Sequence, residues 1–234
     1  MSNPDPRTKI QSKQQPRAVL WDLDGTLIDS AEWHWLSWQE ILHAEGYPIT
    51  QEEFLLGFGR RNDEILREYF GEEADIDRLA RTGEAKENRY REYVEQHGVV
   101  VLPGVEEWLD FLAEDGWQMA IASSAPIENL GIILDVSGLA LYFDAIVGKE
   151  DVVVGKPDPE VYLTAAARLG IPSNRAIVVE DAVAGVIGAH AAGMLTIGVG
   201  PRHADLGAEI SVERLDDLDD DAFSRLLASR VGHP

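Results

Sequence analysis

The sequence contains no cysteine, few basic residues and no long apolar run. The lack of cysteine excludes disulfides, thiolate metal sites and a cysteine nucleophile. No apolar stretch approaches the roughly 20 residues that a membrane-spanning helix needs. Because 20 Lys and Arg stand against 42 Asp and Glu, the formal net charge is −22, and such a surface should repel nucleic acid and anionic membranes. We therefore expect a soluble cytoplasmic protein that binds neither nucleic acid nor a membrane.

The length and composition are those of a globular protein. With 234 residues, 45% of them hydrophobic, the chain can bury a full core as one large domain or as one domain with a substantial insertion. Residues 1–16 are polar and contain proline, which predicts a flexible N-terminal tail and not a signal peptide. The acidic composition fits a salt-rich source or an ordinary acidic enzyme, and the sequence leaves this open.

Short apolar segments rich in Val and Ile alternate with helical patterns. Strands are predicted at 17–21, 117–123, 143–148, 176–180 and 195–200. Helical spacing of apolar residues is found at Val105, Trp108, Leu109 and Leu112, and again at Tyr162, Ala165, Ala166 and Leu169. This alternation predicts an α/β fold with a Rossmann-like, three-layer core in which helices cover both faces of a parallel sheet.

The strand pattern disappears between Ser30 and Gly98. The segment is helical in pattern, with a capping box formed by Thr50 and Glu53 and an apolar stripe through Ala31, His34, Trp35, Trp38, Ile41 and Leu42. We predict an all-helical cap domain at residues 30–98, inserted into a catalytic core made of residues 17–29 and 99–234. At the ligand-binding edge of the sheet, such an insertion would act as a lid.

Polar residues follow four of the predicted strands: Asp22 and Asp24, Ser123 and Ser124, Lys156, and Glu180 with Asp181. Taken singly, each has a simple explanation, such as a helix cap or a surface charge. The carboxyl ends of parallel strands, however, meet at one edge of the sheet, where ligands bind in this class of fold. Together these residues predict a single site.

The residue types of this set suit phosphoryl transfer. The carboxylates of Asp22, Asp24 and Asp181 are hard oxygen ligands of the kind that Mg²⁺ prefers, and the absence of cysteine and of paired histidines disfavours zinc. Mg²⁺, Lys156 and the hydroxyl of Ser123 could contact the oxygens of a phosphoryl group. One of the first two aspartates could act as the nucleophile and the other as general acid and then base.

The order of these motifs resembles that of the haloacid dehalogenase superfamily. DLDGT, Ser123, GKPDP with Lys156, and EDAVAG are similar to its four motifs. The resemblance implies that Asp22 is the nucleophile and that Asp24 is the acid/base, with a backbone carbonyl that also binds Mg²⁺. It further implies that Ser123, Ser124 and Lys156 bind phosphate, that Asp181 is a metal ligand, and that Glu180 is a ligand or a nearby partner.

The position of the cap is similar to that in the subgroup of phosphoglycolate and sugar-phosphate phosphatases and β-phosphoglucomutase. Within it, DSAEWHWLSW, GFGRRNDEIL and AKENRY resemble stretches that imply substrate-facing roles for His34, Arg60 and Lys86. Because Arg60 and Arg61 are adjacent, we expect at most one of them to face the site. The mutase pattern has serines where this chain has Gly59 and Glu64, which weakens the mutase interpretation.

The sequence therefore predicts a Mg²⁺-dependent phosphatase of a small phosphorylated metabolite, such as a sugar phosphate, that works through an aspartyl phosphate. A β-phosphoglucomutase-like mutase is the alternative. A non-catalytic phosphate-binding relative is disfavoured because both Asp22 and Asp24 are present. The substrate and the oligomeric state stay open, with a monomer among the possibilities.

Overall fold

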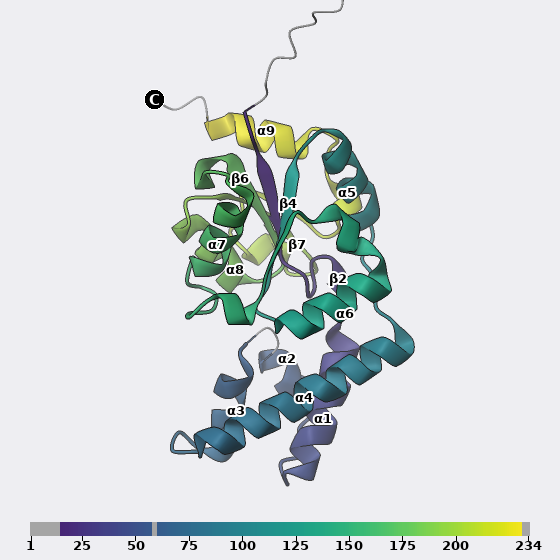
Figure 1. The fold of residues 1–234 in the computed structure, drawn as a ribbon, viewed down its shortest axis with the longest axis vertical. Helices are drawn as coiled ribbons and strands as arrows, with labels where there is room; N and C mark the ends of the chain where they lie inside the picture. The colour runs from purple at the N-terminus through teal and green to yellow at the C-terminus, as the bar shows by residue number, and fades with distance from the viewer. Residues whose placement is uncertain (1–14, 58–59, 231–234) are drawn as a thin grey trace, which may run out of the picture.

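The computed structural model describes residues 15–57 and 60–230, and Figure 1 shows a sheet with its helices above a second group of helices. The strands are β1 (Ala18–Trp21), β2 (Ile28–Asp29), β3 (Val100–Val101), β4 (Gln118–Ala122), β5 (Ala145–Val147), β6 (Ala176–Glu180), β7 (Leu195–Val199) and β8 (Ile210–Val212). The α-helices are α1 (Ala31–Ala44), α2 (Gln51–Gly57), α3 (Asn62–Phe70), α4 (Ile76–His97), α5 (Val105–Glu114), α6 (Ile127–Ser137), α7 (Glu160–Leu169), α8 (Val183–Ala191) and α9 (Ala222–Ser229).

Within the described residues, six parallel strands form the main sheet in the order β5-β4-β1-β6-β7-β8. The order runs outward from β1 in both directions, so the sheet reverses its winding beside β1. Ligands bind at such a switch point in doubly wound sheets. The predicted α/β, Rossmann-like fold is confirmed, and its strand order places the end of β1 at the centre of the carboxyl edge.

Two hydrophobic layers enclose the sheet because successive side chains of a strand point to opposite faces. Val19 and Trp21 of β1 pack in one layer with helices α5, α6 and α9, whereas Ala18 and Leu20 pack in the other with α7 and α8. The predicted apolar faces of α5 and α7 are buried. The strands read as continuous apolar runs because both faces of the sheet are covered.

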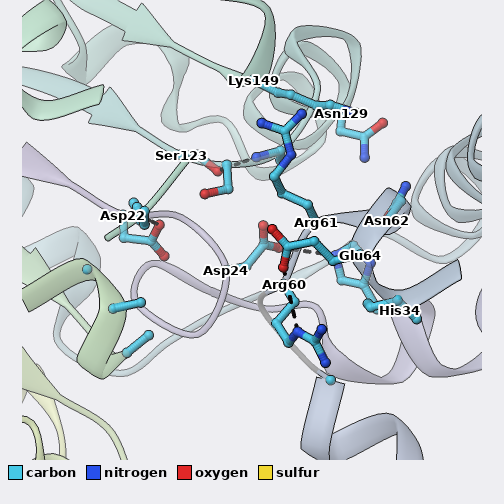
Figure 2. A pocket seen from close by; sticks show the side chains of 18 of the residues that line it. Asp22, Asp24, His34, Arg60, Arg61, Asn62, Glu64, Ser123, Asn129 and Lys149 are labelled. Atoms are coloured by element: carbon cyan, nitrogen blue, oxygen red, sulfur yellow. Dashed lines mark hydrogen bonds and ion pairs between the residues drawn. The ribbon is translucent and has the colours of Figure 1, made fainter. Parts of the chain in front are cut away.

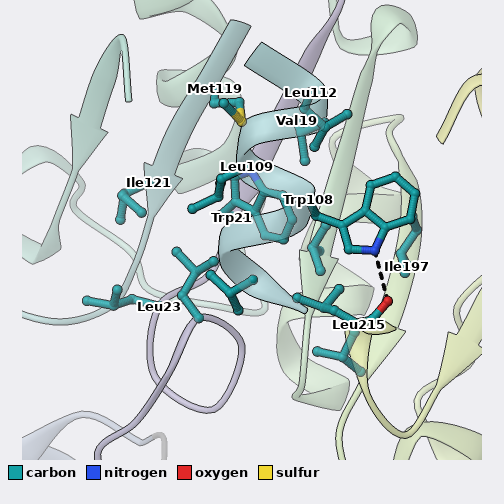
Figure 3. Close-up of a cluster of buried hydrophobic side chains, with 14 of the residues drawn as sticks. Val19, Trp21, Leu23, Trp108, Leu109, Leu112, Met119, Ile121, Ile197 and Leu215 are labelled. Atoms are coloured by element: carbon teal, nitrogen blue, oxygen red, sulfur yellow. Dashed lines mark hydrogen bonds between the residues drawn. The ribbon is translucent and has the colours of Figure 1, made fainter. Parts of the chain in front are cut away.

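A buried cluster around Trp108 joins α5 to the sheet and to the C-terminal part of the chain (Figure 3). The Trp108 indole N–H donates to the backbone carbonyl of Leu215 at 2.9 Å, and the ring lies 4.9 Å from that of Phe223 in α9. A buried indole needs such an acceptor. The cluster fixes α5 and α9 on the same face of the sheet.

Helices α1–α4, here called the helical insertion, lie between β2 and β3, which pair as an antiparallel ladder. Trp38, Leu42, Phe54 and Leu66 are buried together in a separate small core. The predicted capping box is confirmed: Thr50 and Glu53 exchange hydrogen bonds between side chain and backbone at the start of α2. In the part of the chain that the structure describes, no helix is both long enough and apolar enough to cross a membrane.

Some elements depart from the sequence-based prediction. Strand β8 was missed because it is only three half-buried residues long, and β2 and β3 were missed because each has two. Of the predicted tail, residues 1–14 lie outside the described residues, and the carbonyls of Gln15 and Pro16 accept hydrogen bonds from Arg175.

Candidate active site

The ends of β1, β4 and β6 bring distant residues together at the centre of the sheet edge. Asp22 follows β1, and its N–H continues the ladder to Val179 of β6 at 3.0 Å. Ser123 follows β4 in the same way, with its N–H on the carbonyl of Val147 at 3.0 Å. Because β1 lies between β4 and β6, these three strand ends are neighbours.

Lys156 joins two of the strand ends through its ammonium group. Its Nζ lies 2.5 Å from Oδ1 of Asp22 and 2.6 Å from Oε1 of Glu180. Burial works to lower the pKa of Lys156, but the charges of Asp22 and Glu180 outweigh it and hold that pKa well above its usual range. The lysine therefore stays charged in a largely dry site.

Asp22, Glu180 and Asp181 form an acidic group whose ligand oxygens lie within 4.8 Å of one another. Burial, opposed in part by Lys156 and reinforced by the other two carboxylates, raises the pKa of Asp22 well above its usual range. Burial and the charge of Glu180 raise the pKa of Asp181 to about 7. One ammonium, that of Lys156, stands against three carboxylates here, so this oxygen-rich group fits a divalent cation such as Mg²⁺.

Gly25 makes room for Asp181 in this group. Its φ is +85°, and a Cβ there would lie 2.2 Å from Oδ2 of Asp181. A side chain is therefore excluded by both conformation and space. The glycine of the DLDGT motif lets the turn after β1 approach the carboxylate.

Glu180 is held by hydrogen bonds on both of its oxygens. Oε1 accepts from Lys156 and from the Tyr162 hydroxyl at 2.8 Å, and Oε2 accepts from the N–H groups of Asp181 and Ala182, both at 2.9 Å. A carboxylate has about four acceptor positions. Glu180 is thus arranged to hold Lys156, whereas Asp22 and Asp181 keep more freedom to bind a cation.

Asp24 faces a second group of residues, which includes side chains of the helical insertion. The Ser30 hydroxyl donates to Oδ1 of Asp24 at 2.5 Å, and Nε2 of His34 lies 3.6 Å from the same oxygen. Burial would raise the pKa of Asp24, but its interaction with His34, the hydrogen bond from Ser30 and the charge of Lys86 lower it. Ser30 was not singled out from the sequence, although it precedes α1 as a helix-capping residue would.

Lys86 fixes the orientation of His34. Its Nζ lies 2.8 Å from Nδ1 of His34, and an ammonium can only donate hydrogen bonds. We therefore assign the acceptor role to Nδ1 and the proton to Nε2, which faces Asp24. Burial and the charge of Lys86 lower the pKa of His34, which favours this neutral ring.

A pocket of about 220 Å³ lies between the sheet edge and the helical insertion. Its walls contain the residues predicted from the sequence, which are Asp22, Asp24, His34, Arg60, Lys86, Ser123, Ser124, Lys156, Glu180 and Asp181. They also contain polar residues that the sequence did not single out, among them Asn62, Glu87, Asn129 and Lys149. Lys149 follows β5 and could have been found by the strand-end rule. The others depend on how helices α3, α4 and α6 are turned.

Arg60 and Arg61 both contribute atoms to the pocket wall, although at most one of them was expected to face the site. The Arg60 guanidinium pairs with Glu68 at 2.7 Å and lies 3.7 Å from Glu64. Arg61 extends toward Ser123 and Lys149 (Figure 2) and packs over Gly155, where a Cβ would lie 3.5 Å from its Cδ. Gly59, which bears on the mutase interpretation, lies outside the described residues.

Comparisons with known proteins agree with this arrangement. Residues 19–199 match the profile of a family described as haloacid dehalogenase-like hydrolase. Beta-phosphoglucomutase of Bacillus subtilis is 32% identical over 209 residues, which make up 86% of this chain and 91% of the relative. Validoxylamine A 7'-phosphate phosphatase of Streptomyces hygroscopicus subsp. limoneus is 30% identical, with 84% and 92% covered. The solved beta-phosphoglucomutase of Clostridium difficile has the same fold, with a TM-score of 0.83, 24% identity, and 93% and 100% of the two chains covered.

Proposed function

Because the chain belongs to the haloacid dehalogenase-like hydrolase family, we propose that this enzyme is a Mg²⁺-dependent phosphatase of a small phosphorylated metabolite, specifically a sugar phosphate. The observation that carries the proposal is the placement of two aspartates in one pocket. Asp22 lies against Lys156 in the acidic group, and Asp24 lies against Ser30 and His34. Two carboxylates in different surroundings can divide the nucleophilic and acid/base roles.

Asp22 is the nucleophile in this proposal. One of its carboxylate oxygens attacks phosphorus, an aspartyl phosphate forms, and the bond from phosphorus to the ester oxygen breaks. The Lys156 ammonium, 2.5 Å from Asp22, and the Ser123 hydroxyl, with Ser124 beside it, would bind the phosphoryl oxygens. These groups are held at the edge of the sheet before substrate arrives, Lys156 by Asp22 and Glu180, so little reorganisation is needed.

Asp24 is the acid/base. It gives a proton to the departing ester oxygen, and its carboxylate then takes a proton from the water that attacks the aspartyl phosphate and releases inorganic phosphate. Its pKa is lowered in the free protein, and the negative charge of a bound phosphate would favour the protonated form. His34 and Lys86 would orient Asp24 from the insertion.

Mg²⁺ would be held by Asp22, Asp181 and the backbone carbonyl of Asp24, with Glu180 adjacent, and when bound it would supply positive charge to the phosphoryl oxygens. This proposal is supported by the oxygen donors of the acidic group, in which three carboxylates face the one ammonium of Lys156. Residues 17–29 and 99–234 would form the catalytic core, and residues 30–98 would form a cap that excludes water from the closed site.

A phosphosugar mutase is the second candidate, and the pairing of His34 with Lys86 beside Asp24 favours it together with the likeness to proteins named beta-phosphoglucomutase. In a mutase, a sugar hydroxyl and not water would attack the aspartyl phosphate. The ion pair of Arg60 with Glu68 speaks against this candidate, because a mutase must bind the second phosphate of a bisphosphate intermediate, and this pair engages the guanidinium to which the resemblance gives a substrate-facing role.

The two candidates are separated by following two products at once. The enzyme is given Mg²⁺, β-glucose 1-phosphate and a trace of glucose 1,6-bisphosphate, and then a panel of phosphorylated metabolites, while free phosphate and glucose 6-phosphate are measured. We expect phosphate release from at least one sugar phosphate and no isomerisation, and we expect Asp22→Asn to abolish turnover. Glucose 6-phosphate without phosphate release would establish the mutase. Full activity of Asp22→Asn would remove the mechanism.

A further inference from the structure

Glu87 of α4 is a buried carboxylate in the wall of the pocket, 8% exposed. Its Oε1 accepts hydrogen bonds from Nδ2 of Asn62 at 2.6 Å and from Nζ of Lys86 at 3.0 Å, and its Oε2 accepts one from Nδ2 of Asn129 at 2.6 Å. A buried carboxylate is costly unless donors surround it. Glu87 is therefore stable in this place only while its donors stay together.

The donors of Glu87 come from separate parts of the molecule. Asn62 begins α3 of the insertion, whereas Asn129 lies in α6, which packs on the sheet. Asn129 is 1% exposed, and its Oδ1 accepts a hydrogen bond at 2.9 Å from Arg91. Glu87 and Arg91 are four residues apart and share a face of α4, so both can hydrogen-bond to the side-chain amide of Asn129. The Asn129 amide of α6 thus links α4 of the insertion to the sheet domain.

Glu87 also compensates the charge of Lys86. The Lys86 ammonium is buried between the rings of Trp38 and Tyr90, at 5.5 and 5.3 Å from their centroids, and its polar contacts include Glu87 and Nδ1 of His34. Burial would raise the pKa of Glu87, but Lys86, His34 and the two asparagines bring that pKa down to about 2. The carboxylate is ionised, and its charge keeps the lysine in reach of His34.

We propose that Glu87 is a positioning residue that couples the docking of the insertion on α6 to the alignment of the pair formed by Asp24 and His34. The inference rests on the proposed phosphatase function. While Asn129 holds Oε2, Oε1 holds Lys86 on Nδ1 of His34, and the proton of Nε2 points at Asp24. When α4 leaves α6, Oε2 loses its donor, the carboxylate turns toward water, and Lys86 loses its anchor. Proton transfer by Asp24 is then efficient only while α4 of the insertion is packed on α6.

The test uses two esters of nearly the same shape, phenyl phosphate and p-nitrophenyl phosphate. Phenolate is a poor leaving group that needs the proton of Asp24, whereas p-nitrophenolate leaves readily without one. The measured quantity is kcat/KM, which covers the steps up to the transfer of the phosphoryl group to Asp22. Wild type is compared with Glu87→Gln, and with Glu84→Gln as the matched control on an exposed position of the same helix.

Glu87→Gln should lower kcat/KM for phenyl phosphate at least about 10-fold more than for p-nitrophenyl phosphate, because general acid catalysis contributes on the order of 10²-fold or more. Glu84→Gln should change neither value. Asn129→Ala, which leaves the carboxylate in place, should give the same selective loss. The double variant should lose little more than Glu87→Gln alone, because both changes break one link.

Equal losses on both esters in Glu87→Gln would show that the residue only supports the fold, and would overturn the proposal. If Glu87→Gln does not fold, Asn129→Ala carries the same comparison, and an equal loss there has the same meaning. A wild-type enzyme that releases phosphate from neither ester and from no sugar phosphate would instead contradict the proposed function, and the inference with it.

Discussion

Asp22 and Asp24 are separated by one residue but meet opposite surroundings. Asp22 lies in the acidic group, where burial and neighbouring carboxylates raise its pKa, whereas Asp24 accepts a hydrogen bond from Ser30 and lies 3.6 Å from Nε2 of His34, and its pKa is lowered. Titratable groups whose pKa values are moved apart by their environment are typical of acid/base pairs in active sites. The different partners of two neighbouring side chains thus support the proposed division of roles.

Arg60 and Arg61 permit a prediction at the same scale. Replacing Arg61 by Ala should raise KM for a hydrolysed sugar phosphate by roughly 10-fold or more, since charge-assisted hydrogen bonds contribute about 1.5–3 kcal/mol. Arg60→Ala should change KM less, because its guanidinium is engaged with Glu68. Steady-state kinetics of both variants, with p-nitrophenyl phosphate as the smaller reference substrate, measures the difference. A loss confined to Arg60→Ala would restore the sequence-based assignment of Arg60.

Strand β6 and the helix that follows it, α8, together position the acidic group of the site. Gly185 lies in the first turn of α8, and a Cβ there would be 1.9 Å from Oε1 of Glu180. The carboxylate cannot move aside freely, because hydrogen bonds hold both of its oxygens. The absence of a side chain at one helix position therefore allows Glu180 to hold Lys156.

Gly185→Ala should displace Glu180 and with it Lys156. We expect activity to fall by about 10²-fold or more, as when a donor to the reacting group is lost, and stability to fall by about 1–3 kcal/mol from overpacking. Gly131→Ala is the matched control, because a Cβ added at that helical glycine would meet nothing within 4 Å. It should keep activity and gain about 0.5–1 kcal/mol. Activity assays and urea unfolding measure the two effects. A fully active Gly185→Ala would show that Glu180 does not need the space left by the missing side chain.

At the scale of the whole molecule, the formal net charge of −22 opposes the compact state. Salt bridges such as those of Arg89 with Glu40 and Arg78 with Glu45 lie on the surface, and exposed pairs of this kind contribute little each. Self-repulsion among the remaining carboxylates is long-ranged at low ionic strength. The folded chain should therefore depend on the salt concentration of its solvent.

Raising KCl from about 0.1 to about 1 M shortens the Debye length from about 10 to about 3 Å, so we expect the urea midpoint of unfolding to increase. Most of the gain should occur at the lower concentrations, where screening changes fastest. Urea titrations monitored by tryptophan fluorescence, with sucrose as an uncharged comparison, measure it. A midpoint that is flat or falls with KCl would show that repulsion does not limit stability, and would argue against adaptation to a salt-rich source.

The sequence by itself determined the fold class and the residues at the strand ends. A short run such as Ala18–Trp21 forms a buried strand because of its own residues, and the parallel topology then brings Asp22, Ser123 and Glu180 to one edge. Strand β8, with three half-buried residues, had too weak a pattern to be predicted.

Only the tertiary structure decided which side chains of the helices enter the site. Successive residues of a helix point about 100° apart, so the inward position of Glu87 depends on how α4 is turned, and the direction of Arg61 depends on the extended backbone that precedes α3. The bond between Glu87 and Asn129 joins residues 42 positions apart, and no local pattern encodes it. Strand ends are fixed by local sequence and sheet topology, whereas contacts between the insertion and α6 exist only once both have packed.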